Sequence, residues 1–398
     1  MIVSRDPLLH LTYCLNIHRG ESWAENLAAI RDHALRVRRA VAPGRPFGLG
    51  LRLGHQAAEE LAQADRLAEL RGFLAENDLY AFTVNGFPYG PFHGTAVKED
   101  VYRPDWRTAE RRDYTIRLID ILAALLPEGV PGSISTVPGA YKAAVRTPDD
   151  VTRMCRMLAE AAAHAERVYG ETGRDICIAL EPEPDCFLET ADEAVAFFGE
   201  TLPAQAARDD GPMRATGGRG GDILRERLGV CLDTAHAAVE FEDPAAVLDR
   251  LVSAGVRVGK VQLSAALRLS PTAQALRRLG DFADAVYLHQ VKLRGADGAI
   301  RGFADLPEGI AAAQGEGEDT ELRVHFHVPL FFVEAGGLAS TSGLLGREFW
   351  AKVTSPGAAP TGQLEIETYT FDVLPAELRL PDVADSVVRE YEWVLERI

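Results

Sequence analysis

Three acidic residues end short apolar runs, and their carboxylates are typical of a divalent metal site. These residues are Glu181, Asp233 and Glu367. A carboxylate buried at the end of a strand costs several kcal/mol unless a cation pairs with it. Few basic residues are expected to face these carboxylates, the candidates being Arg52 and Lys260, so three carboxylates together indicate a divalent cation. The alternative is that each one caps the following helix or accepts a backbone hydrogen bond.

Histidines accompany these carboxylates at two kinds of spacing. His236 follows Asp233 by three residues, and the two side chains reach one point if the strand turns into a helix directly after Asp233. His236 then binds a metal, or it holds a substrate hydroxyl or the aspartate itself. His325 and His327 are separated by one residue, a spacing that places both imidazoles on one face of a strand. The alternative for each of these histidines is a hydrogen-bonded position in the core.

The elements that must position these residues alternate along the chain. Apolar runs of strand length are separated by stretches with apolar residues at three-to-four spacing, a pattern that predicts repeated βα units and a parallel sheet. One of 258–263 and 322–328 is expected to be the seventh strand, with spacing favouring the first, and 285–292 is a weaker strand candidate. The other predicted strands are 11–18, 47–53, 80–85, 132–137, 176–181, 228–233 and 363–369.

The alternation within each strand distinguishes a closed barrel from an open sheet. In 47–53, for example, Leu49, Leu51 and Leu53 oppose Gly48, Gly50 and Arg52. One face is bulky and apolar, and the other is small at its start and polar at its carboxyl end. Helices outside and a crowded lumen inside produce this pattern, whereas both faces of an open doubly wound sheet are apolar. We therefore predict a (β/α)8 TIM barrel.

The chain is long for a minimal barrel, and the excess is assigned to insertions on the catalytic face. We predict one domain over 1–398 with insertions at about 86–106, 204–226 and 285–335. The first insertion is rich in aromatic residues and is a candidate lid. The second is rich in Asp, Gly and Arg and is expected to form a surface loop. The third is expected to lie across the barrel mouth.

Composition excludes several classes of protein. The net charge of −17 disfavours nucleic acid as a partner, because an acidic chain repels phosphate backbones. No apolar run approaches the length of a membrane span, and the first residues do not resemble a signal peptide. The five cysteines are scattered without a CxxC pair, which favours a reducing compartment. We therefore expect a cytoplasmic protein.

Six motifs, taken in their order along the chain, resemble one family. They are LTYCLNIH, VNGFPYGPFHG, ALEPEP, GVCLDTAH, RVHFHVPLF and LEIETYTF. Together they resemble the EboE-type metabolite traffic proteins, members of the xylose-isomerase-like barrel superfamily, from roughly residue 8 to residue 398. Epimerases of that superfamily hold a divalent metal on Glu, Asp, His and Glu at the ends of strands five to eight. The resemblance assigns Glu181, Asp233 and Glu367 to three of these positions.

The seventh strand departs from the family pattern. By spacing, Gln262 stands where the family has a histidine. A glutamine oxygen binds a hard cation more weakly than imidazole does, and His325 or His327 is expected to supply the missing nitrogen from the following segment. The predicted ligand set suits Mn²⁺ or Mg²⁺, or Zn²⁺ or Fe²⁺ if both histidines bind.

The resemblance also implies a reaction. A metal would polarise a substrate carbonyl and the adjacent hydroxyl, while Glu181 and Glu367 would act as base and acid on opposite faces. The residues expected to hold substrate hydroxyls are Asn16, His18, Asn85, His93 and His236. The predicted function is that of a metal-dependent isomerase or epimerase acting on a polyhydroxylated metabolite of a secondary-metabolite pathway.

Two other functions compete with this one. The first is a carrier without catalytic activity, working in the same pathway with partners from the same gene cluster. The second is phosphoester cleavage of the endonuclease IV kind, which the charge of −17 disfavours.

Overall fold

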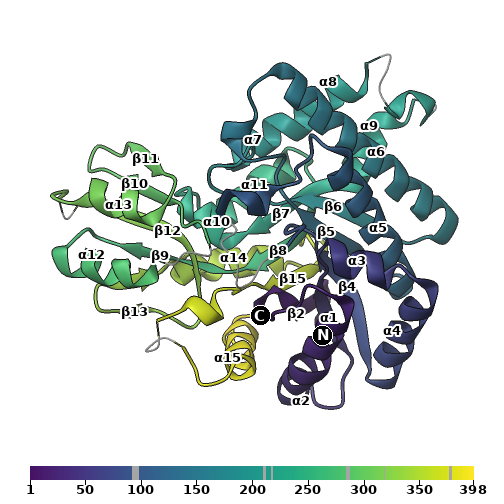
Figure 1. Cartoon of the computed structure of the whole chain (residues 1–398), viewed down its shortest axis with the longest axis horizontal. Coiled ribbons are helices and arrows are strands. Elements are labelled where there is room, and N and C mark those ends of the chain that lie inside the picture. The colour runs from purple at the N-terminus through teal and green to yellow at the C-terminus, as the bar shows by residue number, and fades with distance from the viewer. Residues whose placement is uncertain (92–97, 209–211, 217, 284–286, 318, 376–378) are drawn as a thin grey trace.

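The main sheet contains nine strands, of which eight run parallel, and helices cover its outer side (Figure 1). The computed structural model describes residues 1–398 apart from 92–97, 209–211, 217, 284–286, 318 and 376–378. In order across the sheet, the strands are β1 (Ile2–Arg5), β2 (Leu8–Tyr13), β15 (Gln363–Ile366), β8 (Val258–Leu263), β7 (Leu228–Asp233), β6 (Ile176–Leu180), β5 (Gly132–Thr136), β4 (Leu79–Asn85) and β3 (Phe47–Arg52).

The two ends of this parallel set meet. Cys14, just after β2, forms a parallel bridge with Gly50 of β3. The sheet is therefore nearly closed, and β1 pairs outside this ring as an antiparallel strand with β2. A curved sheet of this kind encloses a lumen lined by every second residue of each strand.

Helices connect most of the parallel strands, and several begin at side chains that accept a backbone hydrogen bond. Ser22, Thr147 and Thr190 each form a capping box with an acidic residue three positions later. The helices of this layer are α1 (Trp23–Ala29), α2 (Leu35–Val41), α3 (His55–Leu61), α4 (Ala64–Glu76), α5 (Ala109–Leu125), α6 (Pro148–Thr172), α7 (Ala191–Ala196), α8 (Leu202–Ala206), α9 (Gly220–Arg227), α10 (Thr234–Val239), α11 (Pro244–Ser253), α14 (Arg347–Val353) and α15 (Val383–Leu395).

The two faces of the sheet differ as the alternation predicted. In β6, Ile176, Ile178 and Leu180 belong to the main apolar core. Cys177 and Ala179, which alternate with them, form a separate small cluster with Cys231. The lumen also holds a fully buried ion pair between Lys260 of β8 and Glu365 of β15. The inner face is therefore small and polar, and the outer face is bulky and apolar.

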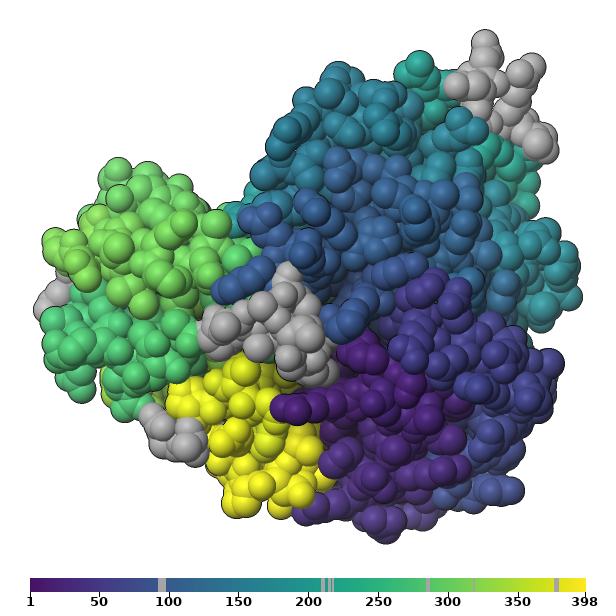
Figure 2. Space-filling model, in the orientation of Figure 1, coloured from purple at the N-terminus to yellow at the C-terminus, as the bar shows by residue number. Residues whose placement is uncertain are grey.

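A second, antiparallel sheet is inserted between β8 and β15. Its order is β11 (Ile300–Phe303), β10 (Val291–Arg294), β12 (Glu321–Val328), β9 (Ala265–Leu269), β14 (Leu338–Ser340) and β13 (Glu334–Ala335), and it carries α12 (Ala273–Leu279) and α13 (Leu306–Ala313). Figure 2 shows this part of the chain, in green, as a lobe beside the rest of the molecule. The run 258–263 is thus the strand of the main sheet, while 322–328 belongs to the second sheet, which begins at Ala265 rather than near residue 285.

Three predicted strands differ from the structure. The run 363–369 is a strand only as far as Ile366. The run 11–18 remains extended only to Tyr13, after which the chain turns into a 3-10 helix over Leu15–Ile17. The run 285–292 contributes only its last two described residues to β10. Among the residues that the structure describes, no helix is long and apolar enough to cross a membrane.

Candidate metal centre

The predicted carboxylates lie at the carboxyl ends of neighbouring parallel strands. Glu181 directly follows β6, Asp233 is the last residue of β7, and Glu367 directly follows β15. Parallel strands place these ends on the same side of the sheet, which is where barrels of this kind carry polar sites. All three side chains are buried, with exposed fractions of 1 to 4%.

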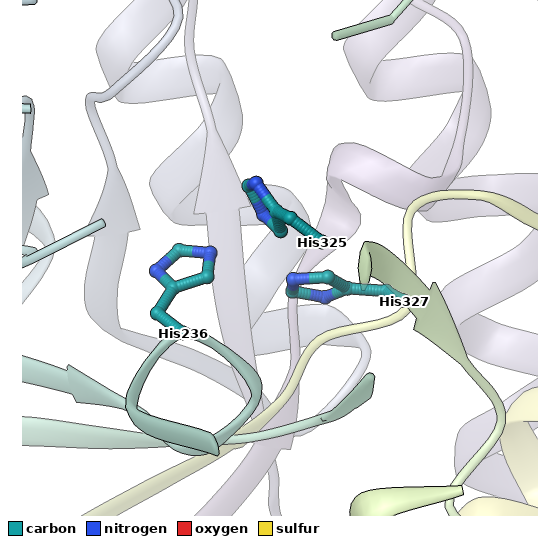
Figure 3. A group of neighbouring side chains, drawn as sticks. All are labelled: His236, His325 and His327. Atoms are coloured by element: carbon teal, nitrogen blue, oxygen red, sulfur yellow. The ribbon is translucent and has the colours of Figure 1, made fainter. Parts of the chain in front are cut away.

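Three histidines complete the cluster from two other elements. His236 lies on α10, the short helix that begins directly after β7, and His325 and His327 lie on β12 of the second sheet. The three rings turn toward one another (Figure 3). The ring centroid of His236 is 4.6 Å from that of His325 and 5.4 Å from that of His327. The second sheet therefore reaches the end of the main sheet and adds imidazoles to its carboxylates.

The cluster forms three overlapping groups, in each of which three ligand atoms lie within 4.8 Å of one another. The groups are His236 with His325 and His327, Glu181 with Asp233 and His236, and Asp233 with His327 and Glu367. Each group shares a residue with each of the others. The donor atoms are thus carboxylate oxygens and imidazole nitrogens, a mixture that transition-metal ions accept.

Hydrogen bonds fix the tautomer of all three imidazoles. Nδ1 of His236 lies 3.1 Å from the carbonyl oxygen of Pro182, and Nδ1 of His327 lies 3.0 Å from that of Glu367. A carbonyl oxygen only accepts, so Nδ1 carries the proton in both rings and Nε2 keeps its lone pair. Metal-binding histidines are oriented by partners of this kind.

The third imidazole is oriented by a side-chain amide. Nδ1 of His325 lies 2.8 Å from Oε1 of Gln290. The amide nitrogen of Gln290 donates to the carbonyl oxygen of Pro184 at 3.1 Å and to the hydroxyl of Tyr102 at 2.9 Å. The carbonyl of Pro184 cannot donate, so the amide nitrogen of Gln290 must face it. The amide oxygen then faces His325, so Nδ1 of His325 carries the proton and Nε2 keeps its lone pair.

Five buried atoms of the cluster have no hydrogen-bond partner among the described residues when the carboxyls are ionised. They are Oε2 of Glu181, Oδ2 of Asp233, Oε2 of Glu367, and Nε2 of His325 and of His327. Leaving one such acceptor unsatisfied costs about 1–3 kcal/mol. A proton shared between Asp233 and Glu367 would pair two of these atoms. The other three have no donor among the described residues, and a bound cation would satisfy all five.

Burial and mutual repulsion control the ionisation of these groups. Burial, followed by the charge of Asp233, raises the pKa of Glu181 well above its usual value, and burial and the charge of Glu181 do the same to the pKa of Glu367. Burial also opposes ionisation of Asp233, but the neighbouring imidazoles, together with hydrogen bonds from the Glu367 carboxyl and the Ser264 hydroxyl, outweigh it and hold the pKa of Asp233 below its usual value. A cation would allow all three carboxylates to ionise.

Burial keeps two of the imidazoles neutral. It lowers the pKa of His236 to about 4, although the neighbouring Asp233 opposes that shift. Burial also lowers the pKa of His325 well below its usual value, and the other histidines add to this effect. Neutral imidazole is the form that binds metal ions.

A pocket of about 540 Å³, including its open mouth, lies above the cluster. Glu181, His236, His325 and Glu367 line it together with Glu183. The hydroxyl of Tyr102 donates to Oε1 of Glu183 at 2.8 Å, and burial raises the pKa of Glu183 to about 8. Gln290 was not predicted as a site residue, because it lies outside the main sheet.

The predicted substrate residues divide into three groups. Asn16, Asn85 and His236 line the pocket, and the amide nitrogens of the two asparagines donate to Oε1 of Glu367 at 2.7 and 3.3 Å. His18 bonds to the hydroxyl of Tyr13 at 2.9 Å and stacks on another histidine, and it does not line the pocket. His93 lies outside the described residues.

The predicted ligand Gln262 is buried on β8, beside Asp233 in the register of the sheet. Its side-chain oxygen, the atom that would bind a metal, accepts a hydrogen bond from the thiol of Cys231 at 3.0 Å. The oxygen of Gln262 is therefore already hydrogen-bonded within the lumen. A nitrogen of His327, from the second sheet, lies near the carboxylates of Asp233 and Glu367 instead.

Known structures resemble this fold at low sequence identity. No protein-family model and no curated protein sequence matches the chain. A crystal structure of the IolI protein with a bound zinc atom is 11% identical with a TM-score of 0.50, and the match covers 97% of this chain and 96% of that one. The fold of this chain is similar to that of the IolI protein.

Two further structures match over most of their length. The probable 3-DHS dehydratase AsbF of Bacillus anthracis is 12% identical with a TM-score of 0.49, covering 98% of this chain and all of that one. An L-ribulose 3-epimerase is 13% identical with a TM-score of 0.48, covering 97% and 92%. The structural neighbours thus include proteins named for epimerase and dehydratase activities, and at these identities the likeness concerns the fold.

Proposed function

We propose that this chain is a metal-dependent enzyme that moves a proton at a carbon next to a carbonyl group, the chemistry of sugar isomerases and epimerases. The observation that carries the proposal is the cluster of buried carboxylate oxygens and imidazole nitrogens, five of which have no hydrogen-bond partner among the described residues when the carboxyls are ionised. We also propose that 1–398 is one (β/α)8 barrel domain of the xylose-isomerase-like type, with the second sheet inserted before its last strand.

The residues that would hold the metal are Glu181, Asp233, His327 and Glu367, with His236 and His325 adjacent to them. The mixed oxygen and nitrogen donors suit Mn²⁺, Zn²⁺ or Fe²⁺ better than Mg²⁺. When bound, such an ion polarises a carbonyl and lowers the pKa of the neighbouring C–H bond.

The carboxyls of Glu181 and Glu367 are the groups proposed to remove and return the proton. Both side chains line the pocket, so each carboxyl can reach a substrate bound there. Asn16 and Asn85 position the Glu367 carboxyl through its Oε1 atom. His236 is placed to meet a substrate hydroxyl at the floor of the pocket.

The proposed role of the protein in the cell rests on the resemblance of its sequence to the EboE-type metabolite traffic proteins. It supports a place in a secondary-metabolite pathway with partners from the same gene cluster. The five cysteines, all unpaired and buried, are compatible with the reducing cytoplasm.

Elemental analysis of the purified chain, after reconstitution with Mn²⁺ or Zn²⁺ and dialysis, tests the metal. We expect at least about one ion per chain, and at least about a tenfold weaker affinity in His327→Gln and Glu367→Gln. His164→Gln, at a partly buried position on α6 outside the cluster, is the matched control and should bind metal as the wild type does. A protein without metal, or equal affinity in His327→Gln and His164→Gln, would contradict the proposal.

Proton exchange tests the reaction. In D₂O, the metal-loaded protein should catalyse deuterium incorporation at the carbon between the carbonyl and hydroxyl groups of hydroxyketones, followed by proton NMR. Glu181→Gln and Glu367→Gln should reduce the rate by at least about a hundredfold. Unchanged exchange in both variants would show that these carboxyls do not handle the proton.

A further inference from the structure

The pocket above the metal cluster has a polar floor and an apolar, largely aromatic wall. The floor is formed by the carboxyls and imidazoles of the cluster. The wall is formed by Phe87, Val101, Tyr102, Tyr287, Leu288 and Tyr369. A ligand that fills this pocket therefore meets metal-binding groups at one end and ring faces and aliphatic side chains along its sides.

The aromatic wall is assembled from segments far apart in the sequence, and its rings pack against one another. Phe87 and Tyr102 lie 6.0 Å apart between ring centroids, at an interplanar angle of 68°. Tyr287 and Tyr369 lie 5.3 Å apart at 73°. Tyr369 also packs on His327, with centroids 4.8 Å apart. Edge-to-face packing of this kind gives the wall a defined shape.

Two polar groups of this wall are already engaged with protein partners. The hydroxyl of Tyr102 donates to Glu183 and accepts from Gln290. The ammonium of Lys98, at the same wall, lies 2.7 Å from a carboxylate oxygen of Asp305. A free sugar carries a hydroxyl on almost every carbon, and each hydroxyl buried without a partner costs free energy. The described wall favours C–H and ring surface over many hydroxyls.

We propose that the substrate is an amphiphilic hydroxycarbonyl compound, with its oxygens at the metal cluster and a planar, apolar body against the aromatic wall. This inference rests on the proposed function, because the metal cluster is what selects the oxygenated end. It narrows the substrate class from polyhydroxylated metabolites in general to those in which the hydroxycarbonyl group is attached to an unsaturated or aromatic ring.

Two α-hydroxyketones that share the metal-binding group and differ in the body attached to it provide the test. 2-Hydroxyacetophenone carries a phenyl ring, and D-fructose carries a chain of hydroxyls. Isothermal titration of the full-length, Mn²⁺-loaded protein should give a Kd for 2-hydroxyacetophenone at least about tenfold lower than the Kd for the open-chain keto form of D-fructose, because the ring leaves water for an apolar wall. The sugar's Kd is therefore calculated for its open-chain fraction, since most of D-fructose is cyclic in water. Acetophenone, which lacks the hydroxyl, should bind at least about fivefold more weakly than 2-hydroxyacetophenone.

Two substitutions of one wall residue separate ring contact from hydrogen bonding. Tyr287→Ala removes the ring and should raise the Kd for 2-hydroxyacetophenone about fivefold or more. Tyr287→Phe keeps the ring and should bind it within about twofold of the wild type. D-Fructose binding as tightly as 2-hydroxyacetophenone, or equal losses in the two variants, would overturn the inference.

The metal content of the same samples shows whether a negative result contradicts the inferred substrate alone or also the proposed function. Protein that holds metal but prefers D-fructose overturns the amphiphilic substrate alone. Protein that holds no metal overturns the proposed function and this inference with it.

Discussion

At the scale of the residue, the two carboxylate oxygens of Asp233 have different roles. Oδ1 accepts hydrogen bonds from the backbone nitrogens of Ala235 (2.7 Å) and His236 (3.0 Å) and from the hydroxyl of Ser264 (2.6 Å), so it caps α10. Oδ2 faces the candidate metal site and has no hydrogen-bond partner among the described residues. Asp233→Asn keeps a capping oxygen but loses the charge, so we expect metal affinity to fall at least about a hundredfold. Asp233→Ala loses the cap as well, which costs about 1–2 kcal/mol of stability.

Denaturant unfolding in EDTA separates these two roles. Without metal, Asp233→Asn should lie within about 0.5 kcal/mol of the wild type, because asparagine is a good N-cap residue, while Asp233→Ala should be less stable. Equal stability of the two variants in EDTA would argue against the capping role. Wild-type metal affinity in Asp233→Asn would argue against the ligand role.

At the scale of the element, the closure of the main sheet depends on Gly50. A Cβ atom there would overlap Oε1 of Glu365 and lie 2.8 Å from the carbonyl oxygen of Tyr13, where β2 and β3 meet. Gly50→Ala should therefore destabilise the protein by about 1–3 kcal/mol. Gly72→Ala, on exposed α4 with no atom near the added methyl group, should stabilise it by about 0.5–1 kcal/mol. The denaturation midpoints of both variants measure these changes in stability. An unchanged midpoint for Gly50→Ala would mean that β2 and β3 move apart to accommodate the methyl group at little cost in free energy.

At the scale of the whole molecule, Glu390 joins three distant segments and makes stability depend on pH. It is buried on α15 and accepts hydrogen bonds from the backbone of Leu330 (3.1 Å) and the hydroxyl of Thr368 (2.7 Å). Burial raises the pKa of Glu390 to about 7. The folded protein keeps this proton between its ordinary pKa and about 7 while the unfolded chain loses it, so the contribution of Glu390 to stability falls as pH rises through that range.

Glu390→Gln removes this dependence and keeps the accepting oxygen. We expect it to stabilise the protein by about 1–3 kcal/mol at pH 8, and most of that gain should disappear at pH 5, where the wild-type carboxyl is largely protonated when folded. Unfolding free energies measured at both pH values check the sign. A stabilisation that is equal at the two pH values would mean that titration of Glu390 is not its cause.

The sequence by itself determined the strands of the main sheet and the polar residues at their ends. Alternation of apolar and small or polar residues is a property of neighbours along the chain, and a period of two decides which face each side chain takes. The positions of Glu181, Asp233 and Glu367 at one end of the sheet follow from this local rule together with the parallel arrangement. The sequence also predicted that the side chains of Asp233 and His236 lie close together, because a strand that turns directly into a helix brings residues three apart to one point.

Only the tertiary structure decided which distant groups join these carboxylates. The second sheet brings His325 and His327 to the cluster through pairing between β9 and β12, which are separated by more than fifty residues along the chain. Pairing between β7 and β8 of the main sheet likewise lets the thiol of Cys231 donate to the side-chain oxygen of Gln262. Contacts between residues far apart in the sequence depend on how whole elements pack against one another. Their free energies are set by burial and by the geometry of the partners, which local periodicity does not specify.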